Sequence, residues 1–149
     1  MSILFINGSP EKDGKTAALA RTLLEGKAYE TLNLTDHKIY PYGSDFADDV
    51  FHAVIQKMKA ADTIVIGSPI YWHNICGAVR NLLDRFYGTV KEGELSGHRL
   101  VFLYQGAAPE KWMLEAGEYT MSRFARLYGL NDLGMAETQK DAKVLTKKL

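Results

Sequence analysis

The chain has 149 residues, a length that suits one domain with its own core, and its 18 basic and 18 acidic residues cancel. No net charge therefore attracts nucleic acid or an anionic membrane surface, and no apolar stretch approaches the ~18 residues of a membrane helix. The single cysteine, Cys76, excludes an internal disulfide or a cysteine-bound metal, and the absence of a signal-peptide pattern predicts a cytoplasmic protein.

Short apolar runs alternate with helical patterns along the whole chain. The apolar runs predict strands at about 2–7, 29–34, 63–66, 99–104 and 132–138. The spacing between them predicts helices at about 15–26, from the pair Asp48-Asp49 to Met58, at 75–86 and at 112–128, with a loop over 35–45. The charged tail 140–149 offers little beyond Val144 and Leu145 to cover the sheet, so we expect a partner subunit there.

The strict alternation of strands and helices defines the expected fold class. It is typical of parallel strands joined by right-handed crossovers, and continuous apolar strands are typical of a sheet covered on both faces. We therefore expect one three-layer α/β domain over residues 1–149, a doubly wound parallel sheet of five strands in the order 2-1-3-4-5.

The same tripeptide, Gly-Ser-Pro, ends two of the predicted strands. It occupies 8–10 after the first strand and 67–69 after the third. In the predicted order these strands are neighbours, and the winding of the sheet reverses between them. Ligands of open parallel sheets bind at such a point, outside the carboxyl ends of the strands. We therefore expect the two segments to line one crevice.

The first of these loops suits a phosphate group. The unpaired amides at the start of a helix carry the positive end of the helix dipole, and Ser9 and Thr16 would add hydroxyl donors. Five residues separate Gly8 from Gly14, whereas a triphosphate-binding P-loop requires four. A monophosphate therefore fits better. The alternative is an ordinary connection in which Thr16 caps the helix.

The second loop suits a planar ring. Tyr71 and Trp72 follow the predicted strand, where they would form a flat apolar surface at the mouth of the sheet. The amides of the following helix would stabilise negative charge on such a ring. The alternative is a rigid loop whose aromatic residues cap the core or fill a subunit interface.

The two loops together resemble the NADPH-dependent FMN reductase family of flavodoxin-like oxidoreductases. The resemblance rests on the order and spacing of four motifs between Ile3 and about Tyr104, namely Gly8-Ser9-Pro10-x3-Gly14-x-Thr16, Gly67-Ser68-Pro69-Ile70-Tyr71-Trp72, Gly77 and Asp84-Arg85-Phe86. It implies non-covalently held FMN and hydride transfer from NAD(P)H to a quinone, flavin, nitro compound or similar acceptor. It also implies a homodimer, in which no side chain is an obligatory acid or base because the flavin carries the chemistry.

The resemblance also implies which residues bind the cofactor. Those at the phosphate would be Ser9, Gly14, Lys15 and Thr16. Those at the isoalloxazine ring would be Pro69, Ile70, Tyr71, Trp72 and Asn74. A third loop, comprising Gln105, Gly106 and Ala107, would close the other side of the ring. Residues that would pack across the dimer are Tyr40, Tyr42, Phe46, Trp112 and Tyr119.

Two other functional classes remain open at this stage. A flavodoxin-type electron carrier would have the same fold, but such carriers tend to be strongly acidic, whereas this chain is neutral. A cofactor-free interaction protein is the other alternative, because a fold alone does not imply an activity. Relatives often carry cysteines between the second strand and second helix, but residues 39–45 hold none that could bind an iron–sulfur cluster.

Overall fold

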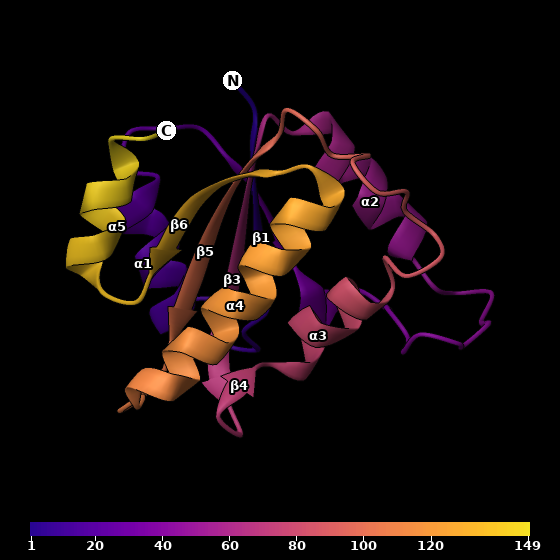
Figure 1. Cartoon of the computed structure of the whole chain (residues 1–149), viewed down its shortest axis with the longest axis horizontal. Helices are drawn as coiled ribbons and strands as arrows, with labels where there is room; N and C mark the ends of the chain where they lie inside the picture. The colour runs from indigo at the N-terminus through magenta and orange to yellow at the C-terminus, as the bar shows by residue number, and fades with distance from the viewer.

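A parallel β-sheet with helices on both faces forms the centre of the computed structural model, which describes residues 1–149 (Figure 1). The main strands lie in the order β2-β1-β3-β5-β6, and every neighbouring pair is parallel. Their bounds are β1 (Ile3–Asn7), β2 (Glu30–Asn33), β3 (Thr63–Tyr71), β5 (Arg99–Gln105) and β6 (Asn131–Ala136). The short strand β4 (Asn74–Ile75) pairs only with β3. Because β4 lies outside this path, β5 and β6 are the fourth and fifth main strands in chain order. The predicted order 2-1-3-4-5 is therefore confirmed.

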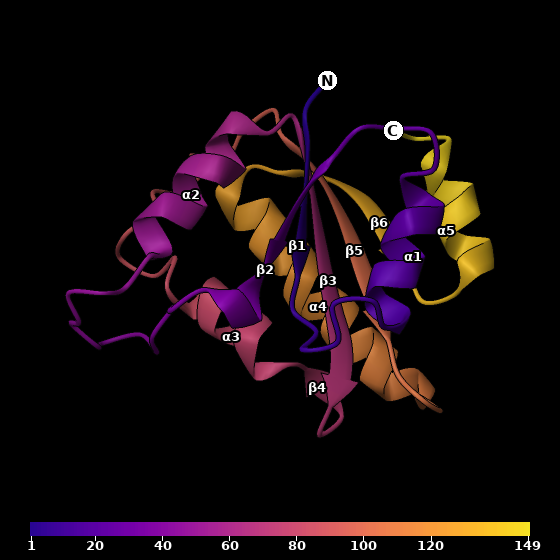
Figure 2. The same ribbon diagram turned by 180° about the vertical axis from the view of Figure 1, so that it is seen from behind.

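Helices cover both faces of the sheet, as Figure 1 and Figure 2 show from opposite sides. One layer contains α1 (Lys15–Leu23) and α5 (Gln139–Thr146); the other contains α2 (Phe51–Ala60), α3 (Gly77–Asp84) and α4 (Lys111–Tyr128). A short 3₁₀ helix, η1 (Leu34–Asp36), follows β2. Alternate residues of the central strands supply the two cores: Leu4 and Ile6 face the α2–α4 layer, whereas Ile3 and Phe5 face α1 and α5. All the helices are too short or too polar to cross a bilayer.

Strand β3 is longer than its sequence predicts. It continues through Gly67-Ser68-Pro69 to Tyr71, so the prediction of a loop at 67–69 is wrong. The reason is pairing with β5, which continues to Pro69, opposite Gln105. The pairing of β3 with β1 ends at Gly67, opposite Asn7. Between that point and Ile70, where β4 begins to pair with β3, the strand has no strand partner on one side, and a proline is tolerated there.

Helix α2 begins later than predicted. It starts at Phe51, so Asp48 and Asp49 precede the first turn instead of lying in it. The Asp49 side chain accepts a hydrogen bond from the backbone N of Phe51 over 2.9 Å, while Asp48 accepts one from Lys38 over 2.6 Å. Asp49 therefore joins the preceding loop to the start of the helix, whereas both partners of Asp48, Lys38 and Tyr40, lie within the loop. Side-chain bonds of this kind compete with helix formation at a terminus.

The C-terminal tail covers the sheet itself, and the expectation that a partner subunit does so is wrong. Residues 139–146 form α5, whose start is stabilised by reciprocal hydrogen bonds between Thr138 and Asp141. Ala142 and Leu145 are buried against α1 and the adjacent face of the sheet. Of the two apolar residues that the sequence singled out in the tail, Leu145 is buried and Val144 is exposed. The other predicted elements agree with the structure to within about one helical turn at their ends.

Candidate functional site

The two Gly-Ser-Pro segments lie side by side at the carboxyl edge of the sheet. The backbone N of Gly8 donates to the carbonyl O of Gly67 over 2.8 Å. A methyl group at Gly8 would lie 2.9 Å from that oxygen, so this close approach requires glycine. Cys76 packs beneath both segments: its N donates to Ser68 Oγ over 2.9 Å, and its Sγ lies 3.3 Å from the Gly8 oxygen. Cys76 is therefore a buried packing residue.

The loop between β1 and α1 leaves the start of α1 without a side-chain cap. Its N-cap residue is Gly14, and the first turn contains no acid. A methyl group at Gly14 would lie 2.8 Å from Glu11 Cβ, so the turn closes only with glycine. Ser9 is buried, and its Oγ accepts a hydrogen bond from the N of Glu11 over 3.1 Å. The arrangement presents unpaired helix amides beside an exposed lysine, Lys15, and suits an anion.

Thr16 connects the first and third loops. It lies inside α1 and does not cap it, so the capping alternative does not hold. Its Oγ1 accepts a hydrogen bond from Gln105 Nε2 over 3.2 Å. A methyl group at Gly67 would lie 2.5 Å from Thr16 Cγ2, so glycine there makes room for the threonine. Thr16 is fully buried in these contacts, which bring residues from three predicted loops together.

The aromatic residues lie on a tight hairpin between β3 and β4, which projects from the carboxyl edge of the sheet (Figure 1). Its two turn residues, Trp72 and His73, have φ values of 47° and 66°, a left-handed conformation that hairpin turns usually assign to asparagine or glycine. Trp72 is 95% exposed and Tyr71 is 47% exposed. The His73 ring meets Trp112, in the first turn of α4, edge to face at 5.4 Å between ring centroids. Asn74 follows, also exposed.

A groove of about 320 Å³ lies between the first turns of α1 and the third loop. Four predicted residues line it, namely Lys15, Gln105, Gly106 and Ala107. Gly106 lies against β3, where an added methyl group would be 3.3 Å from Ile70 Cβ. The opposite wall comes from residues 137–139, at the turn between β6 and α5. Sequence reasoning missed this wall, because only the fold brings the start of the charged tail beside α1.

The motif Asp84-Arg85-Phe86 braces the long loop before α2. Arg85 forms a two-pronged ion pair with Asp49, donates to the Tyr40 carbonyl over 3.0 Å, and lies 4.7 Å from the centre of the Phe51 ring. Burial opposes ionisation of Asp49, but the Arg85 guanidinium and backbone hydrogen bonds lower its pKa to about 2. Asp84 pairs with Arg80 one turn earlier in α3. This motif therefore supports the loop.

One buried hydroxyl beneath the hairpin has no partner. Tyr104, opposite Ser68 in the sheet, is fully buried, and its hydroxyl makes no hydrogen bond. Burial, with a smaller contribution from the nearby Cys76, raises the pKa of Tyr104 to about 12. The ring fits against α4 because Gly117 has no side chain. This tyrosine stays neutral at ordinary pH and fills the core below the site.

The whole chain resembles several solved structures in fold. An FMN-dependent NADH-azoreductase from Bacillus anthracis, in complex with FMN, aligns with a TM-score of 0.72 at 14% identity, covering 99% of this chain and 95% of that one. RosB aligns with a TM-score of 0.81 at 16% identity, covering 99% and 76%. These likenesses show the flavodoxin-like fold.

Curated relatives share sequence over part of their length. An iron–sulfur flavoprotein of Archaeoglobus fulgidus is 37% identical over 98 residues, which cover 57% of this chain and 48% of that protein. An NADPH azoreductase of a Bacillus species is 30% identical over 87 residues, covering 56% and 49%. The chain thus spans about half the length of the curated relatives it matches. The family model for NADPH-dependent FMN reductase matches residues 1–129, and the chain belongs to this family.

Proposed function

We propose that this chain binds FMN at the carboxyl edge of the sheet and passes hydride from NAD(P)H to a small acceptor. The acceptor classes are a quinone, a flavin, a nitro compound or, as the azoreductase relative suggests, an azo compound. The main support for this proposal is that the three predicted loops meet. The first loop is hydrogen-bonded to the second through Gly8 and Gly67, and to the third through Thr16 and Gln105. The iron–sulfur part of one relative's name is not extended to this chain, whose only cysteine is buried.

The first loop fits the phosphate of FMN. Ser9 and Thr16 each accept one hydrogen bond and donate none, so neither hydroxyl hydrogen has an acceptor within the chain, and each would donate to an oxygen of a phosphate that enters the loop. The amides after Gly14 at the start of α1 add the positive end of the helix dipole. Lys15 forms no ion pair, whereas Lys12 is 2.8 Å from Asp36. Lys15 is therefore the lysine of this loop that would neutralise the phosphate.

The second and third loops would hold the isoalloxazine ring. The residues assigned to it are Pro69, Ile70, Tyr71, Trp72 and Asn74 on one side and Gln105, Gly106 and Ala107 on the other. Gly106 lies against Ile70, so these two loops already meet at the edge where the ring would lie. FMN supplies the hydride chemistry, while the residues of the chain orient it and exclude water. The exposed Trp72 is free to cover the ring or to contact a second subunit.

A titration of the purified protein with flavins, followed by anaerobic addition of NADPH, tests the proposal. We expect FMN to bind more tightly than riboflavin, which lacks the phosphate, and the yellow colour to bleach with NADPH. Bound flavin that NADPH does not bleach would favour an electron carrier. A chain that binds no flavin would favour an interaction protein and contradict the proposal.

We also propose a homodimer through the outer face of α3 and α4. Tyr87 and Leu127 are exposed there and line a groove of about 220 Å³, and Tyr42 meets Tyr87 at 6.1 Å between ring centroids. Tyr119, on α4, is also exposed. Clusters of exposed aromatic and aliphatic side chains are typical of protein–protein interfaces. Sedimentation at low micromolar concentration, with Leu127→Glu as the interface variant, tests this. A wild-type monomer that retains FMN and full activity would contradict it.

A further inference from the structure

A buried pair of asparagines lies at the base of the first loop. Asn7 is the last residue of β1 and is fully buried, and Asn33, the last residue of β2, lies directly opposite it in the sheet. Asn7 Nδ2 donates to Asn33 Oδ1 over 3.1 Å. Alternation along β1 places Asn7 on the face of Ile3 and Phe5, which is otherwise apolar. A polar group is costly to bury on such a face unless its hydrogen bonds are made.

Only one arrangement of the two amide groups satisfies their neighbours. The backbone N–H of Ser9 donates to Asn7 Oδ1 over 3.1 Å. Because a backbone N–H can only donate, Asn7 must turn its oxygen toward Ser9 and its NH₂ group toward β2. Asn33 must then present its own oxygen to that NH₂ group. The orientation of Asn33 thus fixes that of Asn7, and Asn7 fixes the backbone of Ser9.

The bond to Asn7 also determines where the Ser9 hydroxyl lies. It closes a tight turn between Asn7 and Ser9, and Ser9 Oγ in turn accepts from the N of Glu11 over 3.1 Å. The Ser9 N–H is therefore occupied and cannot bind a ligand, whereas the hydroxyl hydrogen has no acceptor in the chain. Of the polar groups of Ser9, the hydroxyl alone is left for a phosphate.

Asn33 influences the first loop through Asn7. Its side chain forms one hydrogen bond, the bond from Asn7, and none to the loop itself. Its backbone is held in place, because His37 Nδ1 donates to the Asn33 carbonyl over 2.8 Å. A second link between the same segments, the ion pair of Lys12 with Asp36, is about half exposed on both sides and contributes little.

We propose that Asn7 and Asn33 are positioning residues that set the selectivity of the site for the phosphate of FMN. The inference rests on the proposed function, in which Ser9 donates to that phosphate. A hydroxyl group that is held in place before the ligand arrives loses less conformational freedom on binding, so its hydrogen bond contributes more to the affinity. Without the pair, the backbone of Ser9 could turn and its hydroxyl would lose its defined place.

Titration of the protein with FMN and with riboflavin tests this inference, and the quantity compared is the ratio of the two Kd values. Asn7→Leu removes the acceptor at similar size and should lower the preference for FMN about tenfold, the effect of roughly one hydrogen bond to a charged oxygen. Riboflavin affinity should change little, whereas a general loss of structure would weaken both flavins alike. Asn7→Ser keeps a side-chain acceptor for the Ser9 N and should keep most of the preference.

A double-mutant cycle tests whether Asn33 acts through Asn7. Asn33→Ala, at a partly buried position, should lower the preference about threefold, because Asn7 then lacks the acceptor that orients its amide. In the Asn7→Leu background the same change should have no further effect. Additive losses would show that Asn33 acts by another route and would overturn the inference. If Asn7→Leu does not fold, Asn33→Ala and Asn7→Ser still carry the test.

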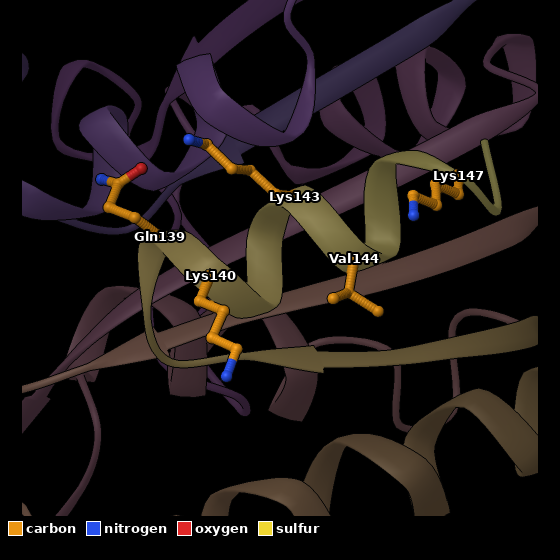
Figure 3. Close-up of a pocket in the computed structure, with 5 residues that line it drawn as sticks. All are labelled: Gln139, Lys140, Lys143, Val144 and Lys147. Carbon is orange, nitrogen blue, oxygen red and sulfur yellow. The ribbon is translucent and has the colours of Figure 1, made fainter.

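A matched pair of lysine variants separates this inference from the proposed function. Lys15→Gln removes a positive charge beside the proposed phosphate and should lower the preference for FMN. Lys147→Gln removes the same charge from the C-terminal end of α5 (Figure 3). That end lies at the opposite edge of the sheet, where Arg99, the first residue of β5, donates to the carbonyl of Leu149 over 3.1 Å. Lys147→Gln should therefore leave both affinities unchanged.

The outcomes are distinguishable. A preference for FMN that falls with Lys15→Gln but not with folded Asn7→Leu refutes the inference alone. A preference that rises in Asn7→Leu also overturns it, because the released N–H of Ser9 would then be a better phosphate donor than the positioned hydroxyl. Equal affinity of the wild-type chain for FMN and riboflavin, or no binding of either, refutes the proposed phosphate site itself.

Discussion

Replacing the two hydroxyl side chains of the first loop would test the phosphate site most directly. Ser9→Ala removes one hydroxyl hydrogen, and Thr16→Val removes the other while keeping the methyl group that packs beneath Gly67. In the structure each hydroxyl accepts one hydrogen bond and donates none. Each should therefore donate one hydrogen bond to a charged phosphate oxygen, a contribution of about 1–1.5 kcal/mol.

The double variant should thus weaken FMN binding by about 2–3 kcal/mol, or roughly 30–150-fold in Kd. Quenching of flavin fluorescence measures the affinity, and riboflavin serves as the matched ligand without the phosphate. Riboflavin affinity should change little, so the preference for FMN over riboflavin should collapse. Circular dichroism checks that the variant is folded. If the folded variant still prefers FMN by the wild-type factor, these hydroxyls do not bind the phosphate and the assignment fails.

Three further predictions concern the supports of the site. Gly117→Ala would place a methyl group 2.5 Å from Tyr104 Cζ, so we expect a loss of about 1–3 kcal/mol in urea unfolding; an unchanged midpoint would show that the ring can move aside. Asp49 has its pKa lowered to about 2, so its ionised form stabilises the fold above pH 4, and this stability is lost as pH falls toward 2. Asp49→Asn should abolish that acid dependence, worth about 2 kcal/mol, and equal pH slopes in both proteins would contradict the role of Arg85. Trp72→Ala should alter flavin affinity or turnover but change stability by less than about 0.5 kcal/mol, because the side chain is 95% exposed; a large drop in melting temperature with unchanged turnover would refute this.

The local sequence determined the layered fold and the place of the site. Alternating apolar runs and helical patterns suffice to predict a doubly wound sheet, because a strand buried on both faces requires helices above and below it. Gly8 and Gly67 marked the switch point, and their hydrogen bond bears out the expected proximity.

Long-range contacts decided the rest. Gly67-Ser68-Pro69 has the composition of a turn, yet pairing with β5 extends the strand through it and moves the turn to Trp72 and His73. The tail has too few apolar residues to indicate a helix that covers the sheet, but α1 supplies the surface on which Ala142 and Leu145 are buried. The same packing places residues 137–139 and the α5 lysines beside the groove. Such features depend on partners more than a hundred residues away, as with Gln139 and Thr22, and local propensity carries no information about them.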